Sequence, residues 1–362
     1  MPKSVKDQIN WLRLTRSRRV GPATFIRLLN EYESVDAALD ALPNIARDAG
    51  VSKYTTCNVG VAEREYDAGR HLGFTPLFLG HPDYPTLLNE APDAPPFLWA
   101  QGNITLGQRD IVAMVGARNA SSLGRRIAGN IARELGAAGV CVASGLARGI
   151  DAAAHQASLQ TGTIAVQAGG LDVIYPKEND ALTNDIAQSG LRLSEQPIGL
   201  IPQARHFPQR NRIIAGVSSA IVVVEGAARS GSLITARIAA ELGREVMAVP
   251  GNPMDGRATG CNILIREGAT LIRSGADILE SLDRPEQSQM AFAEPPAAEI
   301  PRLSARQIAD RILNLLGPSA VSEDDVIRDT GLPTNSVSPQ ITALEITGDI
   351  SRHPGGKLAR KA

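Results

Sequence analysis

The chain has 362 residues, of which 43% are hydrophobic and 21% are charged, as expected for a globular protein of two or three domains. Its net charge of −1 gives no sign of nucleic-acid binding, and an aromatic content of only 4% disfavours a sheet built for base stacking. The cysteines Cys57, Cys141 and Cys261 form no C-x-x-C pair, which predicts reduced thiols and neither a zinc site nor a disulfide framework.

Residues 1–75 are predicted to form a small helical domain. The N-terminus has no apolar signal segment, and no run reaches 18 apolar residues, so we expect a cytoplasmic protein without a membrane span. A basic segment precedes the turn at Gly21-Pro22, after which apolar residues begin a second helix, as in a helix–hairpin–helix or SAM-like unit. Its cations are Arg13, Arg16, Arg18 and Arg19. Two interpretations stay open: amides of the hairpin meet a DNA phosphate, or the basic face is simply solvated.

Residues 76–282 are predicted to form an α/β domain. A proline-rich connector, residues 75–96, is expected to pack in extended form against it. Short apolar runs then alternate with helical segments such as 125–138 and 233–242, which is typical of a doubly wound, mostly parallel, extended Rossmann-like sheet covered on both faces. The predicted strands are 111–115, 140–143, 163–167, 191–194, 220–225, 245–249 and 270–272.

The C-terminal part is predicted to be a linker and a winged-helix domain. Residues 283–302 contain four prolines and four acidic residues and are typical of a linker. In residues 303–362 we expect helices over 305–316 and 335–346, with a helix between them that Ser322 caps, followed by a basic hairpin at Gly355-Gly356.

Ligands of such sheets bind at the carboxyl ends of the parallel strands, so the loops there were compared. The first loop contains Gly116 and Arg118 but matches neither a dinucleotide fingerprint nor a Walker loop. Either the start of the next helix and Arg118 bind a phosphate, or Gly116 only makes the turn and Arg118 is solvated.

The next two loops offer weaker signals. Ser144 and Gly145 end the second strand, and Asp151 and His155 lie four residues apart on the following helix. An acid–base pair or two metal ligands would have this spacing, but an acid in the first helical turn explains Asp151 better, so we predict no catalytic residue and no metal. Lys177 is a candidate phosphate contact or a solvated lysine.

The last two loops carry the sharpest pattern. Arg210 and Arg212 flank Asn211 and follow Phe207, a combination suited to phosphate binding, base stacking and hydrogen bonds to base edges. The loop at Ser230–Thr235 is rich in hydroxyls and begins a helix, so it forms either a phosphate cradle or an N-cap.

In their order along residues 75–280, these segments resemble the DNA-processing protein A family (DprA, also called Smf). The matching motifs are VGARNASSLG, SGLARGIDAAAH, AVQAGGLDVIYPKEN, LSEQPIG, FPQRNRIIAG, VVVEGAARSGSLITA, GREVMAVPGNP and GCNILIREGA. The resemblance implies a homodimer without a cofactor that binds and protects incoming single-stranded DNA and loads the recombinase RecA during natural transformation. The candidate nucleic-acid-binding residues are Gly116, Arg118, Ser144, Gly145, Lys177, Phe207, Arg210, Asn211, Arg212, Ser230, Gly231, Ser232 and Thr235.

Two other functions fit the sequence less well. A nucleotide-binding phosphoribohydrolase of the LOG-like group would use a P-G-G-x-G-T-x-x-E loop, but the corresponding GAARSGSLITA has no glutamate at the required place, which argues against an enzyme. A transcription factor would need a basic recognition helix in the winged helix, whereas the second helix there begins with acidic residues.

Overall fold

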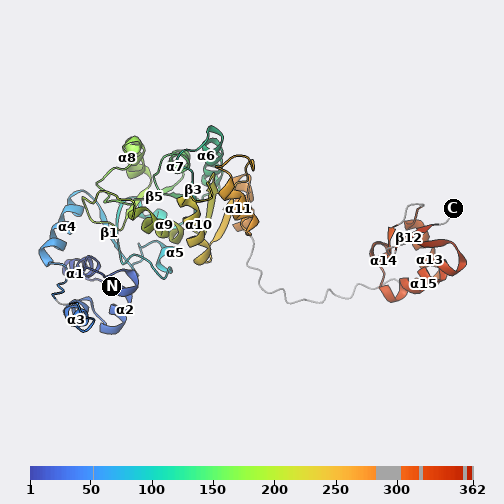
Figure 1. Ribbon diagram of the computed structural model, residues 1–362, viewed down its shortest axis with the longest axis horizontal. Coiled ribbons are helices and arrows are strands. Elements are labelled where there is room, and N and C mark those ends of the chain that lie inside the picture. The colour runs from blue at the N-terminus through green and yellow to red at the C-terminus, as the bar shows by residue number, and fades with distance from the viewer. Residues whose placement is uncertain (52, 283–302, 318–320, 354–356, 361–362) are drawn as a thin grey trace. The chain divides into compact units, whose positions relative to one another are not determined.

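The computed structural model describes residues 1–51, 53–282, 303–317, 321–353 and 357–360. The chain divides into two compact units, Met1–Arg284 and Pro285–Ala362 (Figure 1). The predicted linker, residues 283–302, lies outside the described residues. Within the described ranges, no helix combines the length and the apolar character that a bilayer crossing requires.

A nine-stranded sheet organises the described part of the first unit, in the order β1-β2-β6-β5-β4-β3-β7-β8-β9. Its strands are β1 (Thr75–Phe78), β2 (Phe97–Gly102), β3 (Ile111–Gly116), β4 (Cys141–Ser144), β5 (Thr163–Val166), β6 (Leu191–Ser194), β7 (Ala220–Val224), β8 (Glu245–Ala248) and β9 (Thr270–Leu271). The seven neighbouring strands β6-β5-β4-β3-β7-β8-β9 are parallel to one another. Strands β1 and β2 extend the sheet beyond β6 by antiparallel pairing. The chain leaves β3 toward β4 and leaves β7 toward β8, so the strand order reverses between β3 and β7.

The predicted α/β fold class is confirmed, and each of the seven predicted strands is present with ends within one residue. The prediction missed the two antiparallel strands. The segment 75–96 begins with β1, and β2 follows directly after Pro95-Pro96. Pro76 is tolerated because β1 is an edge strand, where one side of the backbone needs no partner.

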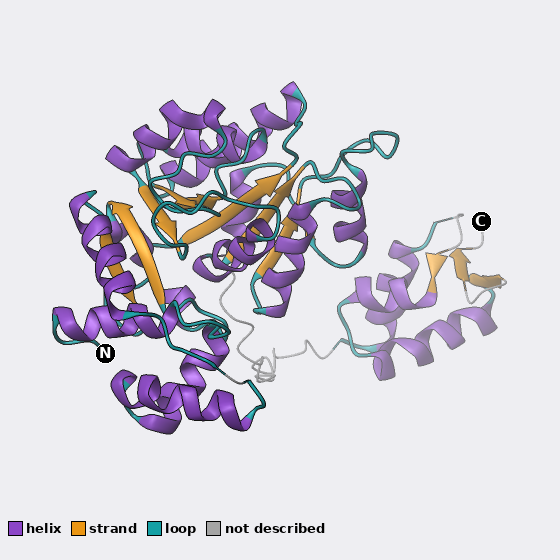
Figure 2. Ribbon diagram, turned by 60° about the vertical axis from the view of Figure 1, so that its left-hand side comes forward, coloured by secondary structure: helices purple, strands orange, loops and turns teal. Residues whose placement is uncertain are grey.

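Helices cover both faces of the sheet (Figure 2). Side chains alternate along β3, so that Val112 and Met114 face one layer, whereas Ile111, Ala113 and Val115 face the other. The first layer consists of α6 (Ser122–Ala137), α7 (Ile150–Ser158), α8 (Asp180–Ser189) and α12 (Gly275–Leu282). The second consists of α5 (Thr86–Asn89), α9 (His206–Val217), α10 (Gly231–Glu241) and α11 (Thr259–Arg266).

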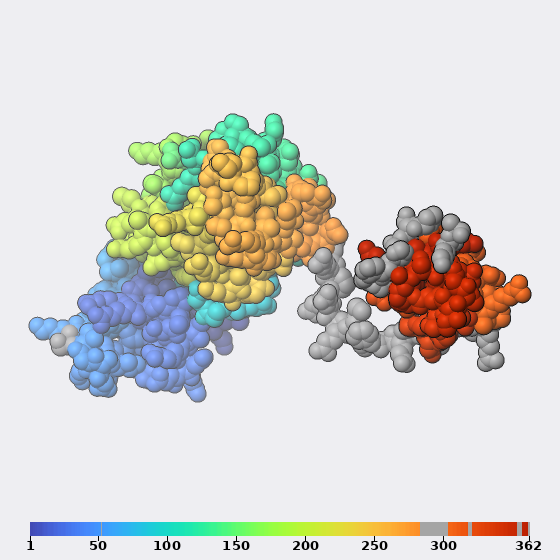
Figure 3. Space-filling model, turned by 45° about the vertical axis from the view of Figure 1, so that its right-hand side comes forward, coloured from blue at the N-terminus to red at the C-terminus, as the bar shows by residue number. Residues whose placement is uncertain are grey.

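The N-terminal helices share a core with the antiparallel strands. These helices are α1 (Val5–Thr15), α2 (Pro22–Tyr32), α3 (Val35–Asp48) and α4 (Val59–His71). Trp11 packs 5.0 Å from Phe25, and Trp99 packs 5.0 Å from Phe97, with both distances measured between ring centroids. Trp11 also donates a hydrogen bond of 2.8 Å to the carbonyl of Pro96. Both tryptophans of the chain therefore join the helices to the sheet, and Figure 3 shows the two as one continuous body.

The second unit has the predicted winged-helix arrangement. Its helices are α13 (Ala305–Leu315), α14 (Glu323–Thr330) and α15 (Thr334–Thr347), and its strands are β10 (Val321–Ser322), β11 (Ile350–His353) and β12 (Lys357–Arg360). The strands pair antiparallel in the order β10-β12-β11. Ser322 occupies the N-cap position of α14, but its side chain makes no capping hydrogen bond, which corrects that part of the prediction.

A substitution at Gly69 on α4 tests how the N-terminal helices pack against the sheet. A Cβ atom at Gly69 would lie 2.4 Å from the buried ring of Trp99, so Gly69→Ala should lower the free energy of unfolding by about 1–3 kcal/mol through overpacking. Gly60 on the same helix is the control, because the nearest atoms would be 3.4 Å from its added Cβ. Gly60→Ala should be neutral or stabilising by up to about 1 kcal/mol in urea unfolding. Equal losses in the two variants would contradict this packing argument.

Candidate nucleic-acid interface

Two cavities open at the carboxyl ends of the parallel strands and form one cleft with two lobes. They share the residues Arg118, Ala147, Tyr175, Pro202 and Phe207. The first lobe, about 650 Å³, reaches toward α10, and the second lobe, about 700 Å³, lies over the ends of β4 and β5. The predicted residues that line the cleft are Gly116, Arg118, Gly145, Lys177, Phe207, Arg210, Asn211, Ser230, Gly231, Ser232 and Thr235. Their role in binding stays a prediction.

Flat side chains meet where the lobes join. The Arg118 guanidinium lies over the Phe207 ring, 5.0 Å from the ring centroid. The ring centroids of Tyr175 and Phe207 are 5.7 Å apart. Arg118 and Tyr175 are exposed, so their faces are available to a planar ligand. Tyr175 is not among the residues predicted from the sequence, although an aromatic residue two positions before Lys177 is a usable signal in a chain with few aromatics.

Arg210 forms part of the floor of the first lobe. Only 5% of it is exposed, and its Nη1 donates a 2.7 Å hydrogen bond to the carbonyl of Val166. A Cβ atom at Gly145 would lie 1.9 Å from that Nη1, so glycine is required there by Arg210 rather than by a ligand. Burial lowers the pKa of Arg210 to about 10, and nearby Asp151 opposes this, so the guanidinium is charged at neutral pH. Its buried Nε has no partner within the described ranges.

The start of α10 borders the same lobe. Ser230 is the N-cap residue but makes no capping bond, because its hydroxyl instead pairs with that of Ser232 at 2.7 Å. Thr235 donates to the carbonyl of Gly231 at 3.2 Å, and the Asn211 amide reaches the same carbonyl at 3.4 Å. The first-turn amides of α10 are therefore not capped by these hydroxyls, which favours the phosphate-cradle interpretation over the N-cap.

The first loop offers no such cradle. A Cβ atom at Gly116 would lie 1.9 Å from the carbonyl oxygen of Val224, so this glycine permits close packing against the end of β7. The start of α6 is already occupied, since Ser121 caps it and donates its own amide to the Glu225 carboxylate at 2.8 Å. A carboxylate of the chain thus lies where a phosphate was expected at this helix start, and Gly116 and Arg118 are the predicted residues of this loop that line the cleft.

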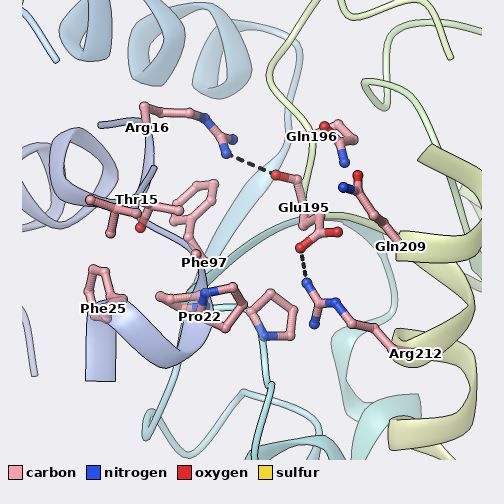
Figure 4. A pocket seen from close by; sticks show the side chains of 13 residues that line it. Thr15, Arg16, Pro22, Phe25, Phe97, Glu195, Gln196, Gln209 and Arg212 are labelled. Carbon is pink, nitrogen blue, oxygen red and sulfur yellow. Dashed lines mark hydrogen bonds and ion pairs between the residues drawn. The ribbon is translucent and has the colours of Figure 1, made fainter. Parts of the chain in front are cut away.

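Two predicted residues do not line the cleft. Ser144 is fully buried and donates to the carbonyl of Met114. Arg212 extends from α9 to Glu195 on the other side of the helix (Figure 4). It also donates a hydrogen bond to the carbonyl of Asp93. Residues two apart on a helix do not share a face, so Arg210 and Arg212 point in different directions. Arg212 lines a separate cavity of about 260 Å³ between α1, α2 and α9.

The four arginines of the N-terminal basic segment differ in their surroundings. Arg16 pairs with Glu65 at 2.8 Å and donates a 2.9 Å hydrogen bond to the carbonyl of Glu195 (Figure 4). Arg13 donates to the carbonyl of Cys57 at 2.7 Å. These two arginines hold the helices together, and only Arg18 and Arg19 are exposed.

Asp151 and His155 form no acid–base pair that a ligand can reach. His155 has no exposed surface, and its Nδ1 lies 2.7 Å from the Thr163 hydroxyl. Burial, followed by the charge of Arg210, lowers the pKa of His155 to about 3. Asp151 accepts the amide of Ala147 at 3.2 Å, and burial raises its pKa despite the nearby Arg210. This supports the structural interpretation of the pair.

A comparison with protein families decides the relationship. The model described as DNA recombination-mediator protein A matches residues 75–283. The chain belongs to this family. The family's accompanying models, a DprA-like N-terminal HHH domain and a DprA winged helix domain, match residues 5–68 and 293–356.

Individual members of the DprA family agree with this assignment. Protein Smf of Synechocystis is 33% identical over 98% of this chain and 99% of its own length. The X-ray structure of DprA from Streptococcus pneumoniae is 39% identical, covers 77% of this chain and 98% of that one, and superposes with a TM-score of 0.63. A Helicobacter pylori DprA structure concerned with single-stranded DNA binding is 28% identical and has a TM-score of 0.53. The match covers 58% of this chain and 96% of that one.

Arg212 was predicted to bind DNA, but its geometry favours a structural role. Arg212→Gln should lower the free energy of unfolding by about 1–3 kcal/mol, because it leaves the largely buried Glu195 carboxylate without its partner. The double variant Arg212→Gln/Glu195→Gln should recover part of this loss in urea unfolding. The salt dependence of oligonucleotide binding should not change in either variant. If the slope of log affinity against log salt fell in Arg212→Gln by the amount expected for one phosphate contact, Arg212 would be a DNA contact after all.

His155 should make stability depend on pH. In the folded state it remains neutral down to about pH 3, whereas in the unfolded chain it titrates near 6.5. Its contribution is therefore complete above pH 6.5 and is lost as the pH falls toward 3. Between pH 7.5 and 5.0, the wild type should lose about 2 kcal/mol more unfolding free energy than His155→Gln. His71→Gln, which removes an exposed imidazole, is the control and should behave as the wild type. Parallel pH profiles for wild type and His155→Gln would contradict the prediction.

Proposed function

We propose that this protein is a non-enzymatic recombination mediator that binds single-stranded DNA in the two-lobed cleft. The observation that carries the proposal is the stack of Arg118, Phe207 and Tyr175 beside the uncapped start of α10. Family membership supports the recombination role, and the Helicobacter pylori relative supports single-stranded DNA as the ligand.

Each part of the cleft suits one part of a nucleotide strand. Phosphates are attracted by the amides at the start of α10 and by Arg118. Bases stack on Phe207 and Tyr175, which requires them to be unpaired, so a duplex is disfavoured. Stacking and phosphate contacts are common to all four nucleotides, and binding with little sequence preference follows.

The proposal extends to partners and outcome. We propose that the protein acts as a homodimer, protects incoming DNA and loads RecA during natural transformation, and family membership is what supports these steps. Nuclease protection and RecA-dependent strand exchange with purified components test them. No catalytic group is invoked, and release of a free base from nucleoside monophosphates by the purified protein would contradict this part.

The DNA site is tested by removing one cation from it. Arg118→Ala should weaken binding of an oligo-dT strand about ten- to hundredfold, because it removes a phosphate contact and one face of the stack. The slope of log affinity against log salt should fall by about 0.7, the value for one phosphate on a single strand. Fluorescence anisotropy at several salt concentrations measures both quantities.

The matched control is Arg126→Ala. Arg126 is exposed on α6, which packs on the opposite face of the sheet from α9 and α10, and its loss changes net charge by the same amount. It should leave affinity and slope close to those of the wild type. If the two variants bind alike, the cleft is not the DNA site.

A further inference from the structure

The start of α6 is blocked by a carboxylate that comes from the end of β7. Glu225 accepts hydrogen bonds from the amide and the hydroxyl of Ser121, 104 residues earlier in the chain, and the amide bond is 2.8 Å long. The Ser121 hydroxyl in turn accepts the amide of Gly124 at 2.8 Å. Ser121 thus caps the Gly124 amide of α6, and Glu225 holds the Ser121 amide and hydroxyl at the start of the helix.

Two features show that the backbone is shaped around this contact. A Cβ atom at Gly124 would lie 2.4 Å from the carboxyl carbon of Glu225, so only glycine lets the carboxylate approach α6 so closely. Glu225 itself has φ = 52°, in the left-handed region that residues other than glycine rarely adopt. Strained backbone of this kind persists where the surrounding structure requires it.

The position of the contact explains its consequence. Strand β3 and helix α6 begin the half-sheet on one side of the reversal in strand order, and the order β5-β4-β3-β7-β8-β9 is that of a dinucleotide-binding fold. In that fold the pyrophosphate lies at the start of the helix after the central strand, which corresponds here to α6. The Glu225 carboxylate occupies this place with the same sign of charge and uses the same kind of donors.

We propose that Glu225 is a specificity determinant that excludes the phosphates of free nucleotides and dinucleotides from the start of α6. A phosphate there would meet a carboxylate of like charge and would have to displace it from Ser121. The start of α10, in the first lobe, remains open, so the fold presents one helix start to anions and closes the other. This inference does not depend on DNA binding in the cleft.

The test is to remove the carboxylate and to measure binding of inorganic pyrophosphate by isothermal titration calorimetry. Glu225→Ala should bind pyrophosphate about tenfold or more tightly than the wild type, because the Ser121 amide and the helix start become available. Glu225→Gln should show a smaller gain, since the neutral amide keeps the hydrogen bond to Ser121 and with it the fold. Glu241→Ala, which removes an exposed glutamate at the end of α10, should show none.

A second substitution locates the new site. Gly124→Asp in the Glu225→Ala background returns a carboxylate to the vacated space and should abolish the gain. A gain that survives Gly124→Asp, or the absence of a gain in both Glu225 variants, would overturn the proposal. The affinity of Glu225→Ala for oligo-dT should stay within about threefold of the wild type, because Glu225 lines neither lobe of the cleft. This DNA measurement separates failure of the inference from failure of the proposed function.

Discussion

The candidate site depends on how Arg210 is fixed against the sheet. Its guanidinium passes directly over Gly145 to the carbonyl of Val166, which ties α9 to the ends of β4 and β5. Phe207 lies three residues earlier, on the same face of α9, so the position of its ring follows from that of Arg210. Arg118 and Tyr175 then lie against Phe207 from two other loops. A single buried cation therefore sets the geometry of a surface assembled from three parts of the chain.

Burying a cation is costly unless its charge and its donors are satisfied. Asp151 opposes the loss of the Arg210 charge, and Val166 accepts one of its N–H groups, but Nε is left without a partner among the described residues. On the opposite side of α9, Arg212 is fully committed to Glu195 and Asp93. Arg212 thus ties α9 to Glu195 and Asp93, whereas Arg210 ties the other side of the helix to the carbonyl of Val166.

The sequence predicted the parallel strands and the loops of the cleft because both are local signals. Apolar runs such as Ala220–Val224 identify buried strands, and glycines, hydroxyls and arginines cluster where those strands end. Arg212 lies outside the cleft that Arg210 lines because side chains two residues apart on a helix diverge by about 200°. Strand β2 was missed because prolines precede it, although its apolar residues pack against the N-terminal helices. The contact between Ser121 and Glu225 joins residues too far apart in sequence for any motif to show.

A net charge of −1 is compatible with a site for a polyanion because several cations in the described parts are paired with carboxylates. Arg16 is paired with Glu65, Arg212 with Glu195, and Arg352 with Glu323 and Glu345. The cations that line the cleft, including Arg118 and Lys177, are few, so the proposed binding of a strand there would release few counterions. In the proposed complex, stacking on Phe207 and Tyr175 and the uncapped amides of α10 would supply much of the affinity, and these contacts do not depend on net charge. The small number of cations near the cleft also bears on Glu225. Because there is little excess positive charge, a single carboxylate at the start of α6 is enough to make the start of α10 the one that attracts a phosphate.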